Sequence, residues 1–235
     1  MQAVILAAGQ GKRLGKLTEN VPKAMVKVNG KPMLQIILDQ LKTVGVTEAI
    51  LIVHYKKEQI QAYFGNEYQG MKLTYAFQEQ MIGDGNAISY AEPHITEDKF
   101  LLIACDNLFP TQHLRNVLKH DSDGVMSACI VDREKAKQLG VFLIEDQKIS
   151  KIIEKSPEPP STLANAYIHY MPKEAFEAIR KSTTPGVGGE YRFVDAVQIM
   201  INNGKKITYE PLTEWIDIGT EEQLQKAQEL AKDLE

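Results

Sequence analysis

Short apolar runs alternate with segments of helical period through the first half of the chain. The apolar runs have the length of buried strands and lie at residues 3–6, 49–53, 73–77 and 100–105. Segments in which apolar residues recur at helical spacing lie between them, at 33–44, 58–64 and 112–118. This alternation predicts βαβ units, and therefore an α/β fold whose mostly parallel mixed sheet is flanked by helices on both faces.

The pattern of the second half is less regular. Strand-length runs occur at 125–131, 141–144, 149–154, 166–170 and 207–210. Helical segments are expected at 173–180, 193–202 and 221–234. No internal repeat, low-complexity tract or linker interrupts the sequence. We therefore expect one domain over 1–235, whose part from about residue 121 onward folds back as a smaller lobe.

The composition narrows the class of ligand. Apolar residues make up 43% and charged residues 25% of the 235 positions, as in ordinary globular proteins. A net charge of −4 disfavours broad binding to nucleic acid or to an anionic membrane. Residues 1–31 nevertheless hold six cations and one acid, so a local basic region on an acidic body suits a small anionic ligand.

The expected location is the cytoplasm. Two cysteines are too few for a disulfide framework and are expected to be reduced, buried thiols. The apolar start of the chain lacks the preceding basic segment of a signal peptide, and no apolar run approaches membrane-spanning length. We expect neither a membrane nor a nucleic acid as a partner.

A glycine-rich loop with fixed cations follows the first predicted strand. Residues 6–14 read Leu-Ala-Ala-Gly-Gln-Gly-Lys-Arg-Leu, and Pro22 and Lys23 come shortly afterwards. Backbone N–H groups can approach a polyphosphate closely only where side chains are absent, and cations are needed to balance its charge. The loop therefore predicts a site for a nucleoside triphosphate (NTP), with Arg13 and Lys23 as its cations.

Two better-known glycine loops do not fit this spacing. A Walker A loop has four residues between its glycines and a hydroxyl residue after its lysine. Here five residues separate Gly9 from Gly15, and Leu17 follows Lys16. A dinucleotide-binding loop reads Gly-x-Gly-x-x-Gly, whereas three residues separate Gly11 from Gly15.

Five motifs in this order resemble those of the sugar-phosphate nucleotidylyltransferases, also called NDP-sugar pyrophosphorylases. They are the loop at 6–14 with Pro22-Lys23, the acid that ends the run 100–105, Glu154-Lys155, Asn165-Ala166, and Trp-Ile-Asp-Ile-Gly-Thr at 215–220. The resemblance covers nearly the whole chain and is greatest to glucose-1-phosphate thymidylyl- and uridylyltransferases. It implies a Rossmann-like nucleotidyltransferase fold, with a nucleotide-binding half over about 1–120 and a sugar-binding half with the C-terminal helix over about 121–235.

Enzymes of this family transfer a nucleotidyl group from an NTP to a sugar 1-phosphate and release pyrophosphate. The attacking phosphate is already anionic at neutral pH, because the second pKa of a phosphate monoester is about 6. No general base is required, and catalysis can come from alignment and charge neutralisation. This chemistry explains a signature of cations and carboxylates without a Ser-His-Asp set.

The resemblance implies a role for each residue of the nucleotide site. Arg13 resembles the arginine that holds the β- and γ-phosphates, and Lys23 resembles the lysine that bridges the α-phosphate and the sugar phosphate. Gln78 matches the glutamine that reads a pyrimidine edge, since an amide can donate to O4 and accept from N3–H of uracil or thymine. The implied nucleotide-binding residues are Leu6, Ala8, Gly9, Gly11, Gln78 and Gly83.

A magnesium site and a sugar site are implied as well. Asp106 follows an apolar strand, where a carboxylate can bind Mg²⁺ that bridges phosphates, because magnesium takes oxygen ligands and few protein ones. Asp217 resembles the second family acid on the same metal. The positions that match the sugar site are Gly140, Glu154, Lys155 and Asn165. Among these, Glu154 and Asn165 can bind hexose hydroxyls, and Lys155 can meet the sugar phosphate.

One segment departs from the family pattern and leaves the base open. Relatives commonly carry Leu-Gly-Thr-Ala or Leu-Gly-Leu-Ala, whereas residues 82–85 read Ile-Gly-Asp-Gly. The carboxylate of Asp84 can accept a hydrogen bond from an exocyclic amine, as on cytosine. It can also cap a helix expected at 86–91, the reading that we favour.

Two other functions are compatible with parts of the sequence. A cytidylyltransferase acting on phosphocholine or inositol phosphate is one, although choline calls for an aromatic cage and only 7% of residues are aromatic. A catalytically inactive nucleotide-sugar sensor is the other, although such a protein is expected to have lost a reactive residue such as Lys23. The sequence names neither the sugar nor the oligomeric state, and a homo-oligomer is compatible with it.

Overall fold

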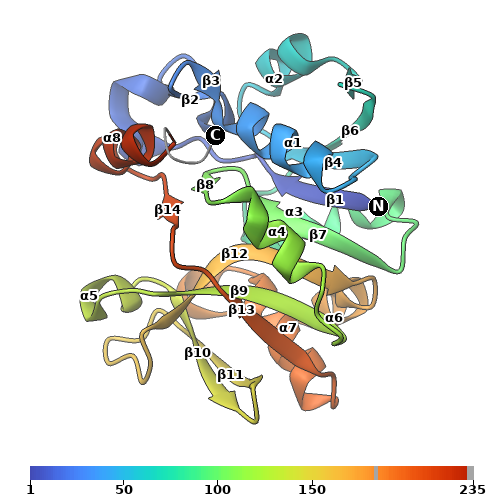
Figure 1. Cartoon of the computed structure of the whole chain (residues 1–235), viewed down its shortest axis with the longest axis vertical. Coiled ribbons are helices and arrows are strands. Elements are labelled where there is room, and N and C mark those ends of the chain that lie inside the picture. Colours follow the sequence, from blue (N-terminus) through green and yellow to red (C-terminus); the bar gives the residue numbers. More distant parts are fainter. Residues whose placement is uncertain (183–184, 232–235) are drawn as a thin grey trace.

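A mixed β-sheet forms the centre of the computed structural model, which describes residues 1–182 and 185–231 (Figure 1). The sheet contains ten strands within the described part of the chain. They are β1 (Gln2–Leu6), β4 (Glu48–Val53), β5 (Glu67–Tyr68), β6 (Met71–Phe77), β7 (Lys99–Ala104), β9 (Gly124–Ile130), β10 (Gly140–Glu145), β11 (Lys148–Glu154), β12 (Leu163–Pro172) and β13 (Ile207–Pro211). Their order is β10-β11-β13-β9-β12-β7-β1-β4-β6-β5.

The first-half strands pair as the alternating pattern predicts. β1 lies between β4 and β7 and is parallel to both, and β4 is also parallel to β6. Ala3, Val4 and Ile5 are all fully buried, because helices cover both faces of the sheet at this point. The carboxyl ends of β1, β6 and β7 therefore meet at one edge.

Alternate residues of β1 face different helices. Ala3 and Ile5 pack with α1 (Met33–Thr43), α2 (Lys57–Phe64) and α4 (Thr111–Val117), whereas Val4 packs with the other layer. That layer comprises α3 (Asp84–Ser89), α6 (Ala175–Lys181) and α7 (Phe193–Asn202). The first-half helices and α7 lie close to their predicted bounds.

The second half forms a ring of strands instead of a continued parallel sheet. β12 is antiparallel to both β7 and β9, and a further antiparallel pairing of β10 with β12 closes the ring β10-β11-β13-β9-β12. Parallel pairing in this half is confined to β9 with β13. The expectation of a mostly parallel, Rossmann-like sheet is therefore right for the first half only, and the fold is a mixed α/β sheet.

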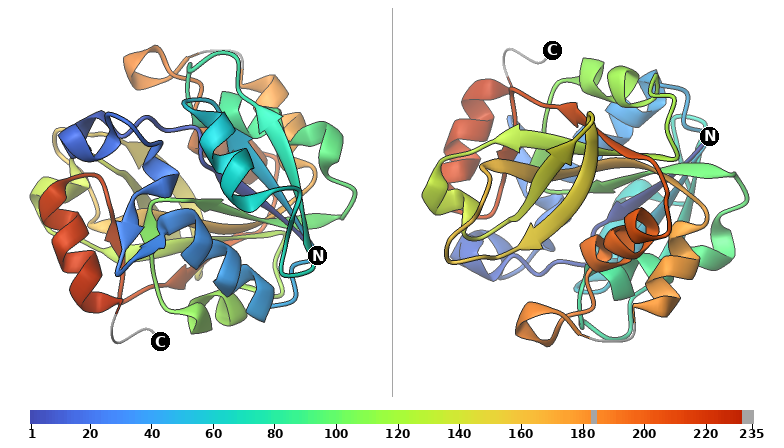
Figure 2. Two further views of the ribbon diagram at one scale, coloured as in Figure 1. Left: turned by 90° about the horizontal axis from the view of Figure 1, so that it is seen from above. Right: turned by 90° about the horizontal axis from the view of Figure 1, so that it is seen from below.

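The physical reason lies in the connections. β10 and β11 are joined by Asp146 and Gln147, which both have positive φ and form a tight antiparallel turn. Apolar runs show where strands lie but not their direction, and no helix separates these two. Figure 2 shows the ring from below, with α7 beside it; Gln198 of α7 accepts a hydrogen bond from the backbone N–H of Ile152 at 2.9 Å.

The end of the described chain returns to the first half. α8 (Glu221–Leu230) packs beside the hairpin formed by β2 (Lys27–Val28) and β3 (Lys31–Pro32), as Figure 1 shows. Its first turn is capped by Thr220, whose Oγ1 accepts from the N–H of Gln223 at 3.2 Å. Of the predicted helix at 221–234, residues 232–234 lie outside the described residues. No helix in the described ranges is both long and apolar enough to cross a membrane.

Candidate active site

A cavity of about 440 Å³ opens where β1, β6 and β7 end. Residues of the glycine-rich loop, charged residues from several segments and a few apolar residues line it. Its lining includes Leu6, Ala8, Gly9, Gly11, Arg13, Lys23, Gln78, Gly83 and Asp106. The structure thus brings all the residues that the sequence assigned to the nucleotide and to catalysis to one cavity, together with one of the two predicted metal ligands.

The glycine-rich loop is shaped by close contacts that exclude side chains. Gly11 has a φ of 74°, and a Cβ there would lie 3.0 Å from the Cβ of Lys23 and 3.0 Å from the Cγ2 of Thr18. The Oγ1 of Thr18 donates to the carbonyl of Gly11 at 2.8 Å and holds the turn. Bare backbone and a buried lysine therefore share one wall of the cavity.

Lys23 is the buried cation of the site. Only 8% of its surface is exposed, and its Nζ forms an ion pair with Asp106. Burial alone would lower the pKa of Lys23, but the ion pair with Asp106 and the charge of Asp217 outweigh it, so the pKa is raised. Lys23 therefore carries a full positive charge at the bottom of the cavity at neutral pH.

Asp217 reaches Asp106 through a small two-stranded sheet. β14 (Ile216–Asp217) pairs with β8 (Asn107–Leu108) and sets Asp217 opposite Asn107. The N–H of Ile218 also donates to the carbonyl of Asp106 at 2.9 Å. Two acids far apart in the sequence are therefore neighbours.

The closeness of Asp106 affects the pKa of Asp217. Burial and the negative charge of Asp106 raise the pKa of Asp217, while Lys23, Lys135 and Arg13 act in the opposite direction. Arg13 comes close from the other side, because a Cβ on Gly219 would lie 2.8 Å from its Nη2. Charges of both signs are thus concentrated at the end of β7.

Gln78 is fixed with its amide nitrogen turned toward protein acceptors. It is 2% exposed, and its Nε2 donates to the carbonyl of Gln80 at 3.0 Å and to Oδ1 of Asn86 at 3.2 Å. The backbone carbonyl of Gln78 accepts a hydrogen bond from Nδ1 of His54 at 2.7 Å. Within the described part of the chain no hydrogen-bond partner of its Oε1 is found, so this oxygen is available as an acceptor.

The loop that departs from the family pattern is locked against the start of α7. Gly83 has a φ of 127°, and a Cβ there would lie 2.2 Å from the carbonyl oxygen of Tyr191. The N–H of Tyr191 donates to the carbonyl of Ile82 at 2.8 Å, and the N–H of Gly85 donates to the carbonyl of Tyr191 at 2.9 Å. A side chain at Gly83 would separate the two segments.

Asp84 serves as a helix cap and not as a free acceptor. Its Oδ1 accepts from the backbone N–H of Gly85 at 2.8 Å and of Phe193 at 2.9 Å, and its Oδ2 accepts from the hydroxyl of Tyr167. The expectation that Asp84 caps the helix that follows it is wrong, because α3 begins at Asp84 itself, its N-cap residue is Gly83, and Asp84 instead accepts from the first N–H of α7.

The predicted sugar-site residues lie beside the cavity and do not line it. Gly140 and Glu154 are paired across β10 and β11, and a Cβ on Gly140 would lie 2.5 Å from Oε2 of Glu154. Burial raises the pKa of Glu154, and the charges of Arg192 and Lys155 partly offset this rise. The Oδ1 of Asn165 accepts from the N–H of Tyr167 at 2.8 Å.

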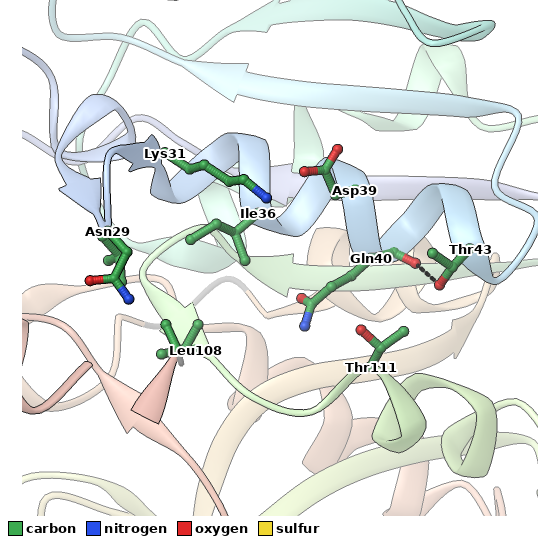
Figure 3. Close-up of a pocket in the computed structure, with 10 residues that line it drawn as sticks. Asn29, Lys31, Ile36, Asp39, Gln40, Thr43, Leu108 and Thr111 are labelled. Atoms are coloured by element: carbon green, nitrogen blue, oxygen red, sulfur yellow. Dashed lines mark hydrogen bonds between the residues drawn. The ribbon is translucent and has the colours of Figure 1, made fainter. Parts of the chain in front are cut away.

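A second, smaller cavity of about 180 Å³ lies away from these groups, between α1, the β2–β3 hairpin and β8. Figure 3 shows Gln40 pointing from α1 toward Leu108 and Thr111. Its Nε2 donates to the carbonyl of Phe109 at 2.6 Å, while its buried Oε1 has no partner in the described ranges of the chain. This cavity holds none of the predicted phosphate-binding or acidic residues, so the larger cavity is the candidate active site.

Comparison with known proteins places the whole chain in one family. The model of the family described as "Nucleotidyl transferase" matches residues 2–233. The chain belongs to the nucleotidyl transferase family. It is 37% identical to a UTP–glucose-1-phosphate uridylyltransferase, AglF, of Haloferax volcanii, over 97% of this chain and 96% of that protein.

Other members of the nucleotidyl transferase family are longer. The bifunctional protein GlmU of Methanocaldococcus jannaschii is 34% identical over 93% of this chain, which spans about half (51%) of that protein.

Among solved structures, a Bacillus anthracis protein proposed to be a glucose-1-phosphate thymidylyltransferase is 26% identical, with a TM-score of 0.87 over 100% of this chain and 97% of that one. A UDP-glucose pyrophosphorylase in complex with UDP-glucose, 23% identical with a TM-score of 0.86 over 100% and 99% of the chains, shares the fold.

The donor set of this nucleotidyl transferase fits a magnesium ion. Asp106 and Asp217 are hard oxygen donors held together in a partly buried place, where their repulsion favours a divalent cation. No group of three or more His, Cys, Asp or Glu that could hold a metal occurs among the described residues. Two carboxylates suffice for magnesium, which keeps several ligands from water and substrate phosphates.

The sequence pattern missed several residues around this site. Tyr167, Glu190 and Arg192 carry hydrogen bonds or charge next to the predicted residues, yet none lies in a recognised motif. Asn107 received no role from the sequence; its Oδ1 accepts from Nε1 of Trp215 at 2.9 Å and its Nδ2 donates to the carbonyl of Tyr167 at 3.4 Å. The positive φ of Tyr167 could not be predicted from the sequence, because glycine is the residue type that indicates such a conformation.

Proposed function

We propose that the protein transfers the nucleotidyl group of UTP or dTTP to a sugar 1-phosphate, with glucose 1-phosphate as the favoured acceptor, and releases pyrophosphate. The observation that carries this proposal is the meeting of buried Lys23 with Asp106 and Asp217 beside a glycine-lined cavity. Membership of the nucleotidyl transferase family and the name of the Haloferax volcanii relative support the reaction and the substrates.

The cavity offers charge balance and alignment, which are what this reaction needs. The acceptor phosphate attacks the α-phosphorus as an anion, so the site requires no general base. Lys23 would hold the α-phosphate and the acceptor phosphate together, because its ammonium is fixed by Asp106 at the bottom of the cavity. Arg13, at the cavity wall beside Gly219, would bind the leaving pyrophosphate with its two-pronged guanidinium.

Mg²⁺ is the proposed cofactor, and Asp106 and Asp217 would hold it. When bound there, the ion would neutralise phosphate charge during the displacement. The exposed backbone N–H groups of Gly9 and Gly11 would complete the cradle around the polyphosphate.

The fixed amide of Gln78 favours a base that carries a hydrogen on N3. The side-chain nitrogen of Gln78 donates to acceptors on Gln80, Gly83 and Asn86, so its Oε1 is the atom proposed to meet the base. An oxygen acceptor attracts the N3–H of uracil or thymine, whereas N3 of cytosine carries a lone pair and repels it. Asp84 does not supply a substitute acceptor for the cytosine amine, because three protein donors already bond it.

The sugar is proposed to lie beside Glu154, at the end of β11, and Asn165, near the start of β12. Glu154 would accept hydrogen bonds from hydroxyls, and the free Nδ2 of Asn165 would donate to them, since its Oδ1 is used by Tyr167. Lys155 would meet the sugar phosphate from its place beside Glu190, 3.6 Å away. The absence of a side chain at Gly140 leaves the carboxylate of Glu154 its room.

The two alternatives are less well supported. A phosphocholine enzyme needs an aromatic cage, but the aromatic residue beside Asn165 is Tyr167, which is partly buried and whose hydroxyl is bonded to Asp84. An inactive sensor has no need for a charged lysine fixed between two acids, and this chain keeps that arrangement.

The direct test is pyrophosphate release by the purified protein with Mg²⁺, using each of five NTPs against a panel of sugar 1-phosphates. We expect the greatest release with UTP or dTTP and glucose 1-phosphate. Product with CTP and an alcohol phosphate would favour the cytidylyltransferase, and no product with any pair would favour the sensor. A cytoplasmic location and a homo-oligomer stay predictions, which cell fractionation and light scattering would check.

A further inference from the structure

Tyr167 has a backbone conformation that a strand residue rarely adopts. Its φ is 55°, and the pairing of β12 with β9 is interrupted between Asn165 and His169, on either side of it. Non-glycine residues in this region are strained and persist only where their surroundings hold them in place. The strain at Tyr167 therefore calls for an explanation in the contacts that it makes.

Those contacts reach three different parts of the active site. The hydroxyl of Tyr167 donates to Oδ2 of Asp84, next to the predicted base site. Its N–H donates to Oδ1 of Asn165 at 2.8 Å, and its carbonyl accepts from Nδ2 of Asn107 at 3.4 Å. Asn107 adjoins Asp106, so one residue connects the nucleotide loop, a predicted sugar ligand and the proposed metal site.

Asp84 extends the connection to the start of α7. Its Oδ1 accepts from the N–H groups of Gly85 and Phe193, and the segments around them are joined by the backbone hydrogen bonds of Tyr191. A Cβ on Gly85 would lie 3.0 Å from the carbonyl carbon of Arg192, so the two segments touch without a gap. The loop 82–85 and the segment 190–193 therefore form one unit.

The segment 190–193 also belongs to the sugar side. Glu190 lines the main cavity and lies 3.6 Å from Lys155. Arg192 is 8% exposed, and its buried Nη1 has no hydrogen-bond partner among the residues that the structure describes. Its charge is the main influence that opposes the effect of burial on the pKa of Glu154. A displacement of the nucleotide loop would thus be felt by residues proposed to hold the sugar phosphate.

We propose that Tyr167 and Asp84 are positioning residues that couple the two substrate sites, so that a bound nucleotide raises the affinity for the sugar phosphate. This inference rests on the proposed function. A nucleotide that contacts Gly83 would hold the loop, and the hydrogen bond from Tyr167 to Asp84 would then favour the orientation of Asn165 that receives the sugar. Such coupling is a free energy shared by two sites, and it acts equally in both directions.

The pair keeps its hydrogen bond over the working range of pH. Burial raises the pKa of Tyr167 well above its usual value, so the hydroxyl keeps its proton. Tyr170, three residues along the same strand, makes a matched control. Tyr170 packs with the layer of α1, α2 and α4, whereas Tyr167 packs with that of α3, α6 and α7; Nζ of Lys99 lies 5.6 Å from the Tyr170 ring centroid, and no hydrogen bond of its hydroxyl is found within the described residues.

The test is a calorimetric titration of glucose 1-phosphate into the protein, in a buffer that contains Mg²⁺. It is carried out without and with the α,β-methylene analogue of UTP, which cannot react. In the wild-type protein we expect the analogue to tighten binding of the sugar phosphate about fivefold or more. Tyr167→Phe removes one oxygen and should reduce this factor toward one, with both ligands still bound. Tyr170→Phe should leave the factor as in the wild type.

Asp84→Asn provides an independent variant, because the amide keeps the shape but alters the acceptor. The single and double variants should lose the same coupling, so that the two effects do not add. An unchanged factor in both Tyr167→Phe and Asp84→Asn, with both ligands bound, overturns this inference and leaves the proposed function intact. Loss of the factor in Tyr170→Phe overturns it as well. Failure of the wild-type protein to bind either ligand overturns the proposed function and this inference together.

Discussion

Lys23 shows how one side chain can serve both the fold and the chemistry. It is buried, paired with Asp106 and packed against the glycine at position 11. We expect Lys23→Ala to lower kcat at least about 100-fold, because a fixed charge aimed at the reacting phosphates is lost. Steady-state rates with saturating substrates would measure this.

Lys16 is the control for that substitution, since it lies in the same loop and is exposed. Lys16→Ala should keep wild-type activity. If Lys23→Ala stays folded by circular dichroism and turns over within a few-fold of the wild type, the role given to Lys23 is wrong.

A buried histidine gives the fold a dependence on pH. His113 is 4% exposed, its Nε2 bonds Oγ of Ser127 at 2.6 Å, and burial lowers its pKa to about 4. The unfolded chain takes up the proton near the ordinary value of about 6.5. The contribution of His113 is therefore complete above pH about 6.5 and is lost as the pH falls through about 4, by up to about 3 kcal/mol.

Urea unfolding at a series of pH values between these limits would measure the loss. His113→Gln should flatten the dependence of the unfolding free energy on pH. His94→Gln, at the partly exposed turn after α3, should leave it unchanged. Equal slopes for the wild type and His113→Gln would show that another group titrates.

At the scale of elements, the close approach of the loop 82–85 to the start of α7 depends on one missing side chain. A Cβ at Gly83 would lie 2.2 Å from backbone, whereas Gly204, which also has a positive φ, has no atom within 4 Å of such a Cβ. Gly204→Ala carries the cost of an alanine at positive φ, about 1–2 kcal/mol, and Gly83→Ala carries about 1–3 kcal/mol, because Gly83 has φ 127° and ψ 167°, a region that essentially only glycine adopts. Gly83→Ala should lower the melting temperature further and raise KM for the nucleotide, while Gly204→Ala should change the melting temperature alone.

How far the elements could be predicted follows from the kind of signal that each one leaves. β1, β4 and β7 are largely apolar on both faces, β6 carries Lys72 and Thr74 on one face, and the runs of all four were read to within about two residues. β8 and β14 are only two residues long and leave no pattern, yet they bring Asp217 to Asp106. That meeting was predicted only from the resemblance of motifs, since pairing at long range is decided by packing.

The residues that the sequence missed share a physical cause. Asp84 was expected to cap its own helix, and its bond to Phe193 depends on the contact between two loops. Tyr167 holds a conformation that its residue type disfavours, so local propensity pointed to an ordinary strand. Local patterns thus describe the elements, while the wall between the two proposed substrate sites is set by tertiary contacts.

At the scale of the whole molecule, α8 packs against the glycine-rich loop of the candidate active site. Leu224 is 7% exposed and packs with Leu14 and Ile218, and Oε1 of Gln223 accepts from the N–H of Gly219 at 2.9 Å. The last described helix therefore holds both the loop that carries Arg13 and the segment that carries Asp217.

Leu224→Ala should weaken this closure from a distance. We expect a loss of about 2–5 kcal/mol of unfolding free energy from the cavity left behind. We also expect a lower kcat/KM for the nucleotide, because Leu14 and with it Arg13 lose their support. Leu17→Ala, in the same loop but 43% exposed, should change neither quantity appreciably. Urea unfolding and steady-state kinetics would separate the two effects: a fall in stability with unchanged kcat/KM would mean that the glycine-rich loop keeps its shape without α8.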